Sequence, residues 1–267
     1  MTEQRLPPFD DTPDVIDATG WRCMDFLSDL HLQAAEPANF QAWSHHMATT
    51  PAQAVFILGD LFEVWVGDDV LDADNSGDFE RECVQVLRQA AQRLSVFWLR
   101  GNRDFLTGQG FAQAAQLRTL SEPCVLATAQ QRLLLSHGDR LCLDDRAYQT
   151  FRQEVRSPAW QHAFMARPLT ERQAIAQGLR QQSMAQKQSG AVYADVDATA
   201  ARHWLAQTQT QVLLHGHTHR PGCHDLGEGL SRWVLSDWDM QAQPPRGDVL
   251  RCEAGHWTRV PMHPLNT

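Results

Sequence analysis

Five short segments of the sequence end in side chains that commonly bind divalent metal ions. In order along the chain they are Asp29-Leu30-His31, Gly59-Asp60, Gly101-Asn102, His137 and His215-Gly216-His217-Thr218-His219. Each follows a short apolar run, which predicts a strand buried on both faces. Ligands of open α/β sheets bind beyond the carboxyl ends of the strands. If the five strands are parallel neighbours, seven donors converge on one crevice and could hold two metal ions: Asp29, His31, Asp60, Asn102, His137, His217 and His219.

The types and spacing of these donors suit a pair of divalent ions. Asp29 and His31 face one ion if their segment is extended, because side chains alternate along a strand. The two carboxylate oxygens of Asp60 can bridge two ions, and Asn102 adds an uncharged oxygen. These three segments also have an ordinary structural interpretation as capping residues or tight turns. The histidines of 215–219 are seldom needed for packing, and histidine is the commonest ligand of such metals.

The composition is that of one globular, metal-dependent enzyme. The chain has 267 residues, of which 43% are hydrophobic, and is long enough for a large core. Its formal net charge of -9 argues against nonspecific binding to nucleic acid. An anionic substrate would then need a local positive site, which two divalent cations provide. The six cysteines form no CxxC pair, which favours reduced, mostly buried thiols in a cytosolic protein.

Alternating strands and helices must position these donors. We expect core strands at Arg22–Ser28, Ala54–Leu58 and Val96–Leu99, and a first helix starting at Phe40–Met47. Asp78–Leu94 is the clearest helix, because its apolar residues recur on one face and Asp78 is a plausible cap. Beyond the last histidines, the runs Trp233–Ser236 and Asp248–Cys252 predict closing strands of an antiparallel kind.

The chain divides into an arm and one domain. Residues 1–20 are polar and contain three prolines without an apolar core, so we expect a loose arm rather than a signal peptide. Residues 21–267 form the domain, and no run approaches the length that spans a bilayer. The interval from about 146 to 196 is rich in Gln and Ala and predicts a helical insertion.

The five blocks, taken together, resemble the signature of the calcineurin-like metallophosphoesterases, D-x-H, G-D, G-N, H and G-H-x-H, over Asp29–His219. Longer stretches around them, such as Leu58–Asp69 and His137–Asp145, are similar to the UDP-2,3-diacylglucosamine diphosphatases of lipid A synthesis. The resemblance implies an α/β fold with a β-sandwich core flanked by helices (αββα) and a helical lid insertion. It also implies hydrolysis of the diphosphate bond of UDP-2,3-diacylglucosamine by attack of metal-activated water on the α-phosphorus. The products would be UMP and 2,3-diacylglucosamine 1-phosphate (lipid X).

The same resemblance assigns roles to individual residues. One Mn²⁺ would be held by Asp29, His31, Asp60 and His219, and a second by Asp60, Asn102, His137 and His217, with His215 orienting a ligand. The catalytic residues would be Asp60, Arg103 and His217. Substrate contacts would come from Asn102, Arg103, Asp145, Tyr148, Ser183, Lys187 and His217, although the segment after Ser183 departs from the family pattern and Lys187 is shifted in register.

Arg103 stands where phosphatases of this family carry a histidine that assists the leaving group. A departing phosphate monoester leaves as an anion near neutral pH, whereas an alkoxide needs a proton. A guanidinium can pair bidentately with phosphate oxygens. Arg103 therefore favours a diphosphate substrate over a monoester.

The implied partners are the lipid-linked UDP-sugar and the cytoplasmic face of the inner membrane, with peripheral association and no nucleic acid. Apolar residues of the insertion could line an acyl groove, lean into the membrane, or simply pack on the core; they are Trp160, Phe164, Met165, Leu169 and Ile175. An alternative is a phosphodiesterase or pyrophosphatase that acts on a soluble nucleotide. A scaffold without metals is disfavoured because no ligand is missing, and the sequence does not predict the oligomeric state.

Overall fold

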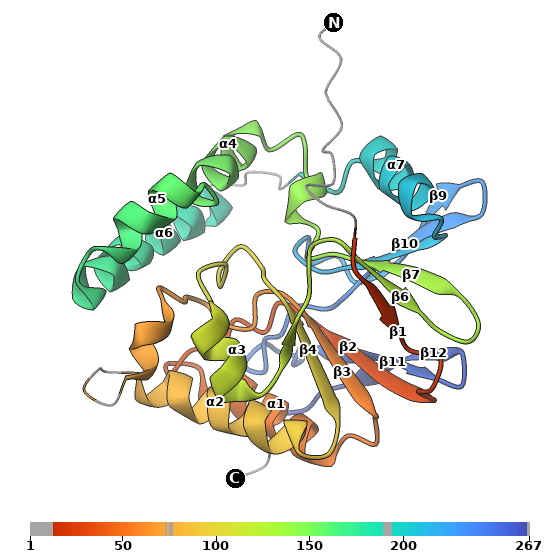
Figure 1. Ribbon diagram of the computed structural model, residues 1–267, viewed down its shortest axis with the longest axis horizontal. Coiled ribbons are helices and arrows are strands. Elements are labelled where there is room, and N and C mark those ends of the chain that lie inside the picture. Colours follow the sequence, from red (N-terminus) through yellow and green to blue (C-terminus); the bar gives the residue numbers. More distant parts are fainter. Residues whose placement is uncertain (1–12, 73, 75–76, 189–193, 266–267) are drawn as a thin grey trace, which may run out of the picture.

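Two six-stranded sheets stack face to face, and helices cover their outer faces in the computed structural model (Figure 1). The structure describes residues 13–72, 74, 77–188 and 194–265, without the side chains of 182–188. The first sheet has the order β12-β11-β2-β3-β4-β5 and the second β1-β6-β7-β8-β10-β9. The αββα arrangement expected from the sequence is confirmed.

The strands of the first sheet are β2 (Cys23–Leu27), β3 (Ala54–Leu58), β4 (Ser95–Leu99), β5 (Arg118–Thr119), β11 (Asp248–Glu253) and β12 (His256–Pro261). Those of the second are β1 (Val15–Asp17), β6 (Cys124–Ala127), β7 (Arg132–Leu135), β8 (Val212–His215), β9 (Gly222–Gly227) and β10 (Leu230–Val234). Helices α1 (Pro37–Thr49), α2 (Asp78–Ala91) and α3 (Gln109–Ala115) lie on the outer side of the first sheet, and α7 (Ala198–Thr208) lies on that of the second (Figure 1).

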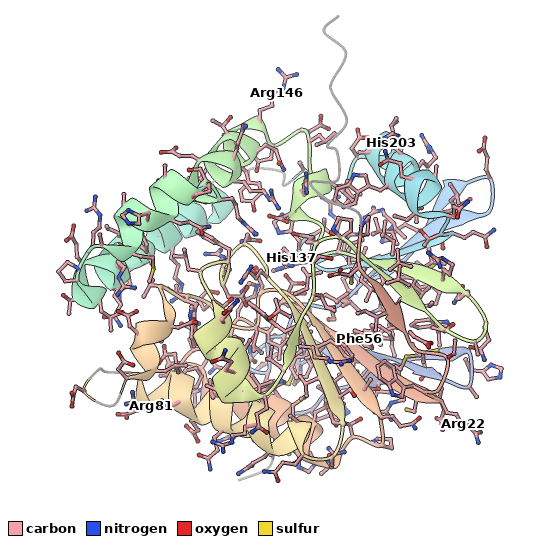
Figure 2. All side chains as sticks on the ribbon, viewed as in Figure 1. Arg22, Phe56, Arg81, His137, Arg146 and His203 are labelled. Atoms are coloured by element: carbon pink, nitrogen blue, oxygen red, sulfur yellow. The ribbon has the colours of Figure 1, made fainter. Side chains whose placement is uncertain are left out.

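Three stacked phenylalanines set the register of the central strands. Phe26, Phe56 and Phe97 are paired residues on β2, β3 and β4 and lie in the core between the two sheets. Their ring centroids are 5.0 Å and 4.7 Å apart, and the planes are nearly parallel. Figure 2 places Phe56 on this part of the sheet. Because side chains alternate along a strand, this register also fixes which residues reach the carboxyl edge together.

The segments predicted to bind metal follow strands of both sheets. β2, β3 and β4 are parallel neighbours in the first sheet, whereas β7 and β8 are parallel neighbours in the second. The expectation of five neighbouring strands is therefore wrong. The carboxyl ends of the two groups meet instead, as shown by the 2.9 Å contact of His137 Nδ1 with the carbonyl oxygen of Leu58. The site forms where the two sheets face each other at this edge.

Several local predictions need correction. The N-cap of α2 is Gly77, and Asp78 lies in the first turn, where it pairs with Arg81 at 2.6 Å. The run Trp233–Ser236 was expected to be antiparallel, but β10 ends at Val234 and is parallel to β8 while antiparallel to β9. β11 is antiparallel to both of its neighbours, as predicted.

Part of the segment predicted to be a loose arm, residues 1–20, is a strand. Residues 1–12 lie outside the described part of the chain. Val15–Asp17 form β1, which pairs in parallel with β6, and Ala18 is buried. The final part of the expected arm therefore belongs to the second sheet.

The interval predicted to be a helical insertion contains α4 (Arg146–Val155), α5 (Pro158–Met165) and α6 (Leu169–Gln188), which lie to one side of the sheets (Figure 1). Arg172 of α6 is buried and donates hydrogen bonds to the carbonyl oxygen of Val66 and to Asp69. This buried arginine attaches the insertion to the segment that follows β3. No helix of the described residues is long and apolar enough to cross a bilayer.

A buried ion pair on β2 gives a prediction about stability. Burial would raise the pKa of Asp25, but hydrogen bonds from Arg251, His46 and Thr50 outweigh it and lower the pKa from 3.8 to about 2. A carboxylate with a lowered folded-state pKa stabilises the fold above its unfolded pKa and loses this contribution as pH falls through the folded value. We expect about 2–3 kcal/mol to be lost between pH ~4 and pH ~2.

Denaturant unfolding of the wild type and of Asp25→Asn, measured from pH 6 to pH 2, checks this expectation. The difference in free energy of unfolding between the two proteins should be constant near neutral pH and shrink below pH ~4. A difference that did not change on acidification would contradict the assignment.

Candidate metal centre and active site

Five of the seven predicted ligands have the left-handed backbone conformation that non-glycine residues rarely adopt. Their φ angles are 54° for Asp29, 49° for His31, 52° for Asp60, 65° for His217 and 52° for His219. Each such residue costs of order 1–3 kcal/mol and persists only when its surroundings fix it, often at functional sites. The turns at the ends of β2, β3 and β8 therefore aim these side chains at a cost in stability.

Two glycines allow the loops of the site to approach one another. A Cβ atom on Gly101 would lie 2.0 Å from Oδ1 of Asp60. A Cβ atom on Gly216 would lie 2.3 Å from Oδ2 of Asp29. The glycines that precede Asn102 and His217 are thus required by close packing against the carboxylates, which explains the G-N and G-H parts of the pattern.

The first group of donors consists of Asp29, His31 and His219, whose ligand atoms lie within 4.8 Å of one another. The Nε2 atoms of His31 and His219 are 3.5 Å apart. The opposite ring nitrogens face carboxylates, with His31 Nδ1 3.1 Å from Glu63 and His219 Nδ1 3.4 Å from Asp237. If both Nδ1 atoms carry protons, both Nε2 lone pairs point at the same space, and a proton or a metal cation must lie between them.

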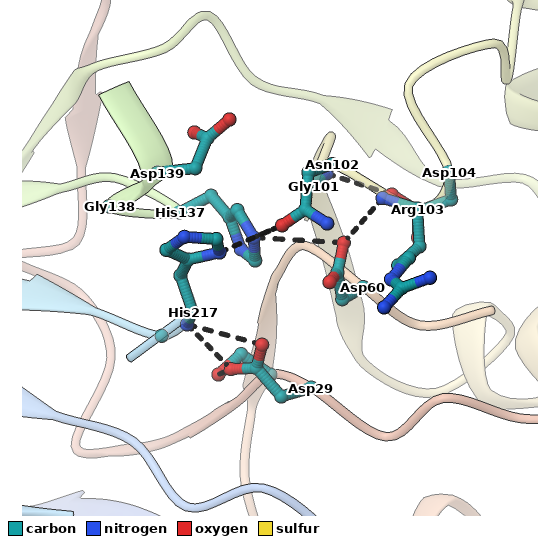
Figure 3. A network of polar contacts seen from close by, with 12 residues as sticks. Asp29, Asp60, Gly101, Asn102, Arg103, Asp104, His137, Gly138, Asp139 and His217 are labelled. Carbon is teal, nitrogen blue, oxygen red and sulfur yellow. Dashed lines mark hydrogen bonds and ion pairs between the residues drawn. The ribbon is translucent and has the colours of Figure 1, made fainter. Parts of the chain in front are cut away.

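The second group brings Asn102 and two histidines next to Asp60 (Figure 3). Oδ1 of Asn102 is 3.0 Å from Nε2 of His137 and 2.8 Å from Nδ1 of His217. Nε2 of His137 is 3.6 Å from Oδ1 of Asp60. The backbone N–H of His217 donates to the carboxylate of Asp29, at 2.9 Å from Oδ2. All seven predicted ligands therefore belong to one continuous polar cluster.

The charge of this cluster calls for cations. Burial would lower the pKa of His137, yet the nearby Asp60 and Asp29 raise it to about 9. In the same way, burial is outweighed at His219 by Asp237 and Asp29, which raise its pKa to about 10. Buried carboxylates thus hold protons on two predicted ligands. Divalent cations, bound by oxygen and imidazole donors of this kind, would supply the same compensation.

Two carboxylates without a predicted role, Glu63 and Asp237, lie beside the predicted histidine ligands His31 and His219. Burial would raise the pKa of Glu63, but His31, Arg103 and Arg180 lower it to about 2. Burial is likewise outweighed at Asp237, where hydrogen bonds with His219 and Arg246 lower the pKa to about 2. Glu63 lies within the sequence motif that follows Asp60, so the motif could have indicated a role for it. Asp237 follows β10 outside any motif, and nothing in the sequence indicated a role for it.

Asp104 is the third acidic residue without a predicted role. It is fully buried and accepts hydrogen bonds from the backbone N–H groups of Leu61 and Gly101, both at 2.8 Å. Burial and the charge of Asp60 raise its pKa to about 6. Asp104 joins the loops after β3 and β4, which explains why an aspartate completes the sequence Gly-Asn-Arg-Asp.

The predicted substrate contacts are placed unevenly. Arg103 borders the metal cluster, and its backbone N–H donates to Asp60 at 2.8 Å (Figure 3). Asp145 is the N-cap of α4, where it accepts from the backbone N–H of Tyr148. The Tyr148 ring lies 5.7 Å from that of His217, but its hydroxyl donates to Asp139 at 2.5 Å.

Ser183 and Lys187 lie on α6, and their side chains fall outside what the structure describes. His215, expected to orient a ligand, is buried, with Nδ1 2.8 Å from the carbonyl oxygen of Gly216 and Nε2 3.4 Å from Arg232.

Of the apolar insertion residues, Phe164 is buried and Met165 exposed. The six cysteines, all in described parts of the chain, are free.

Comparison with known proteins identifies the family. The model of the calcineurin-like phosphoesterases matches residues 25–221, which include every predicted metal ligand. The chain belongs to the calcineurin-like phosphoesterase family. Family membership implies that this phosphoesterase binds a divalent metal.

Several curated relatives of this phosphoesterase share a name. A protein of Bordetella pertussis named UDP-2,3-diacylglucosamine hydrolase is 44% identical over 230 residues, covering 84% of this chain and 88% of the relative. One of the same name from Chromobacterium violaceum is 44% identical over 241 residues, covering 89% and 98%. A solved Vps29 structure from Entamoeba histolytica matches with a TM-score of 0.44 and 15% identity, over 91% of this chain and 99% of that one.

Metal binding should be measurable without turnover. We expect added Mn²⁺ to raise the melting temperature of the wild type by several degrees, because a ligand at 100 times its Kd stabilises the fold by about 2.7 kcal/mol. Asp60→Ala should lose most of this increase, whereas Asp144→Ala, on a nearby exposed residue, should keep it. An increase of the same size in Asp60→Ala would exclude the proposed cluster as the metal centre.

Metal binding should also release protons at pH 7. His137 and His219 have raised pKa values and are protonated at that pH in the metal-free protein. Ligation requires neutral imidazole, so metal affinity should rise with pH up to about pH 10, the higher of the two pKa values. Calorimetric titrations in two buffers of different ionisation enthalpy measure the released protons, and identical apparent enthalpies would contradict the expectation.

Proposed function

We propose that this phosphoesterase hydrolyses the diphosphate bond of UDP-2,3-diacylglucosamine and releases UMP and 2,3-diacylglucosamine 1-phosphate. The observation that carries the proposal is the position of Arg103 beside the polar cluster formed by the seven predicted metal ligands. The name shared by relatives that match most of the chain supports the substrate. A place in lipid A synthesis follows from this substrate.

Two Mn²⁺ ions are the proposed cofactor. Asp29, His31, Asp60 and His219 would hold one, and Asp60, Asn102, His137 and His217 the other. When bound, such ions acidify water and neutralise phosphate charge. Glu63 and Asp237 would keep a proton on the outer nitrogens of His31 and His219, which leaves their inner nitrogens free to ligate.

Arg103 distinguishes this site from one suited to monoesters. Its side chain is partly exposed, at 18%, and carries a permanent positive charge that can pair with oxygens of the diphosphate. The leaving phosphate needs no proton at neutral pH, so a guanidinium can replace a general acid. Asn102 and His217 lie on the opposite side of Asp60 and complete the binding of the phosphoryl group (Figure 3).

The insertion would serve the lipid part of the substrate. Among the side chains that the structure describes, its helices carry the exposed large apolar residues Phe151, Met165 and Leu179. A cavity of about 400 Å³ lies between α6 and the segment after Asp60, and its lining includes Trp65 and Val66. We propose that acyl chains lie along this face and that the protein associates peripherally with the cytoplasmic side of the inner membrane. Asp145, Tyr148, Ser183 and Lys187 remain the proposed contacts for the rest of the substrate.

The purified protein with Mn²⁺ should cleave UDP-2,3-diacylglucosamine in ¹⁸O-labelled water and place the label in UMP. UDP-N-acetylglucosamine, which has no such acyl chains, should be a poor substrate. Equal cleavage of both compounds would favour the alternative, a pyrophosphatase acting on soluble nucleotides, and label in the sugar phosphate would contradict attack at the α-phosphorus.

Arg103→Lys should lower kcat by about 10- to 100-fold. Lysine keeps the charge but loses bidentate pairing with a phosphate group whose charge develops in the transition state. The metal affinity should not change, because the contact of residue 103 with Asp60 is made by its backbone. Steady-state kinetics together with Mn²⁺ titration separate the two effects, and an unchanged kcat would remove Arg103 from the mechanism.

A further inference from the structure

Glu63 joins the metal centre, Arg103 and the insertion in one set of ion pairs. Its Oε2 lies 3.1 Å from Nδ1 of His31. Its Oε1 lies 2.9 Å from Nε of Arg180 on α6 and 3.7 Å from a terminal nitrogen of Arg103. The Glu63 side chain is only 12% exposed, so water screens these contacts weakly.

The two arginines share one oxygen but are held with different strength. Both contacts are ion pairs, but the Arg180 pair is short, at 2.9 Å, whereas the Arg103 pair is longer, at 3.7 Å, and therefore weaker. Glu63 therefore attracts the guanidinium of Arg103 but does not fix its position. This arrangement suits a guanidinium that must remain available to an anionic substrate.

The contacts of Arg180 depend on the position of the insertion. Besides Glu63, it donates to Oε1 of Gln33 at 2.9 Å, and Gln33 belongs to the loop that carries His31. Glu63 and Arg180 also line the cavity of about 400 Å³ beneath α6. A movement of α6 would change the distance between Arg180 and Glu63. The attraction between Glu63 and Arg103 would then change as well.

We infer that Glu63 is a positioning residue that couples the docking of insertion helix α6, through Arg180, to the placement of Arg103 at the scissile diphosphate. The inference rests on the proposed function in one respect, namely the contact between Arg103 and a phosphate group. Removing the charge of Glu63 leaves two guanidinium groups near each other without the anion between them, and they then repel. Arg103 moves because Arg180 is bound by a second contact, to Gln33.

The kinetic test is a double-mutant cycle with saturating Mn²⁺. Glu63→Gln should lower kcat on UDP-2,3-diacylglucosamine by about tenfold in the wild type and by less than twofold in Arg103→Ala, because both changes remove the same transition-state interaction. Arg180→Gln should behave in the same way with a smaller effect. If Glu63→Gln is equally harmful in both backgrounds, Glu63 acts through His31 alone and the inference is wrong.

A matched control lies within the insertion. Arg167 and Glu171 form an exposed i,i+4 ion pair, with side chains 48% and 47% exposed. Arg167→Gln and Glu171→Gln remove the same kinds of charge as Arg180→Gln and Glu63→Gln without touching the site. These control variants should change kcat by less than twofold, and a tenfold loss in them would show a general effect of charge on the insertion.

A second readout does not depend on turnover. The side-chain Nε–Hε NMR signal of Arg103, assigned by its absence in Arg103→Lys, can be followed in protein loaded with diamagnetic Zn²⁺. It should shift in Glu63→Gln and in Arg180→Gln but not in Arg167→Gln. If the Arg103 signal does not shift in Arg180→Gln, the coupling is wrong, even if the lipid substrate is cleaved. If the signal shifts but the lipid substrate is not cleaved, the coupling stands and the proposed function is wrong.

Discussion

The crowding of buried carboxylates at the strand ends is the constraint on which the rest of this structure depends. Asp29, Asp60, Asp104 and Asp139 are all buried within the loops that follow β2, β3, β4 and β7. Several like charges in a poorly hydrated space repel strongly unless positive charge is brought among them. This positive charge comes from histidines and arginines and, in the proposed function, from two divalent cations. The groups that compensate the buried carboxylates are then the same groups that take part in catalysis.

Arginines fasten the insertion to the site, in addition to apolar contacts such as those of Leu169 with the core and of Trp160 with Phe105. On α4, Arg152 pairs with Asp139 at 2.8 Å, and Arg156, its C-cap, donates to the carbonyl oxygen of Gly101 at 2.8 Å. On α6, Arg172 and Arg180 reach Asp69 and Glu63. Because these partners belong to the loops that bear the ligands, the insertion and the metal centre are mechanically linked. Phe151, Met165 and Leu179 of these helices remain exposed.

Strain at the site is supported by regular structure below it. The left-handed turns at Asp29 and Asp60 are held by hydrogen bonds that extend the pairing of β2 and β3, such as the 3.1 Å bond from the N–H of His31 to the carbonyl oxygen of Asp60. Beneath them the stacked Phe26, Phe56 and Phe97 keep the strands in register. An over-determined scaffold of this kind is what allows unfavourable backbone angles to persist.

The candidate ligand types and most of the core strands follow from the sequence alone. Buried strands such as Ala54–Leu58 and the glycine–ligand turns after them are local features, because alternation of side chains and tight turns involve only a few neighbouring residues. The longer motifs also indicated the family, and with it the αββα fold. These features required no knowledge of which segments meet.

Only the tertiary structure decided how the strands are distributed and which carboxylates support the ligands. The division of the site between two sheets and the parallel pairing of β10 with β8 depend on contacts between distant segments. The same holds for the pairing of Asp237 with His219 and of Glu63 with Arg180. An exposed or loop acidic residue looks the same in any sequence, and it becomes a partner of a metal ligand only when folding places a histidine or arginine within a few ångströms of it.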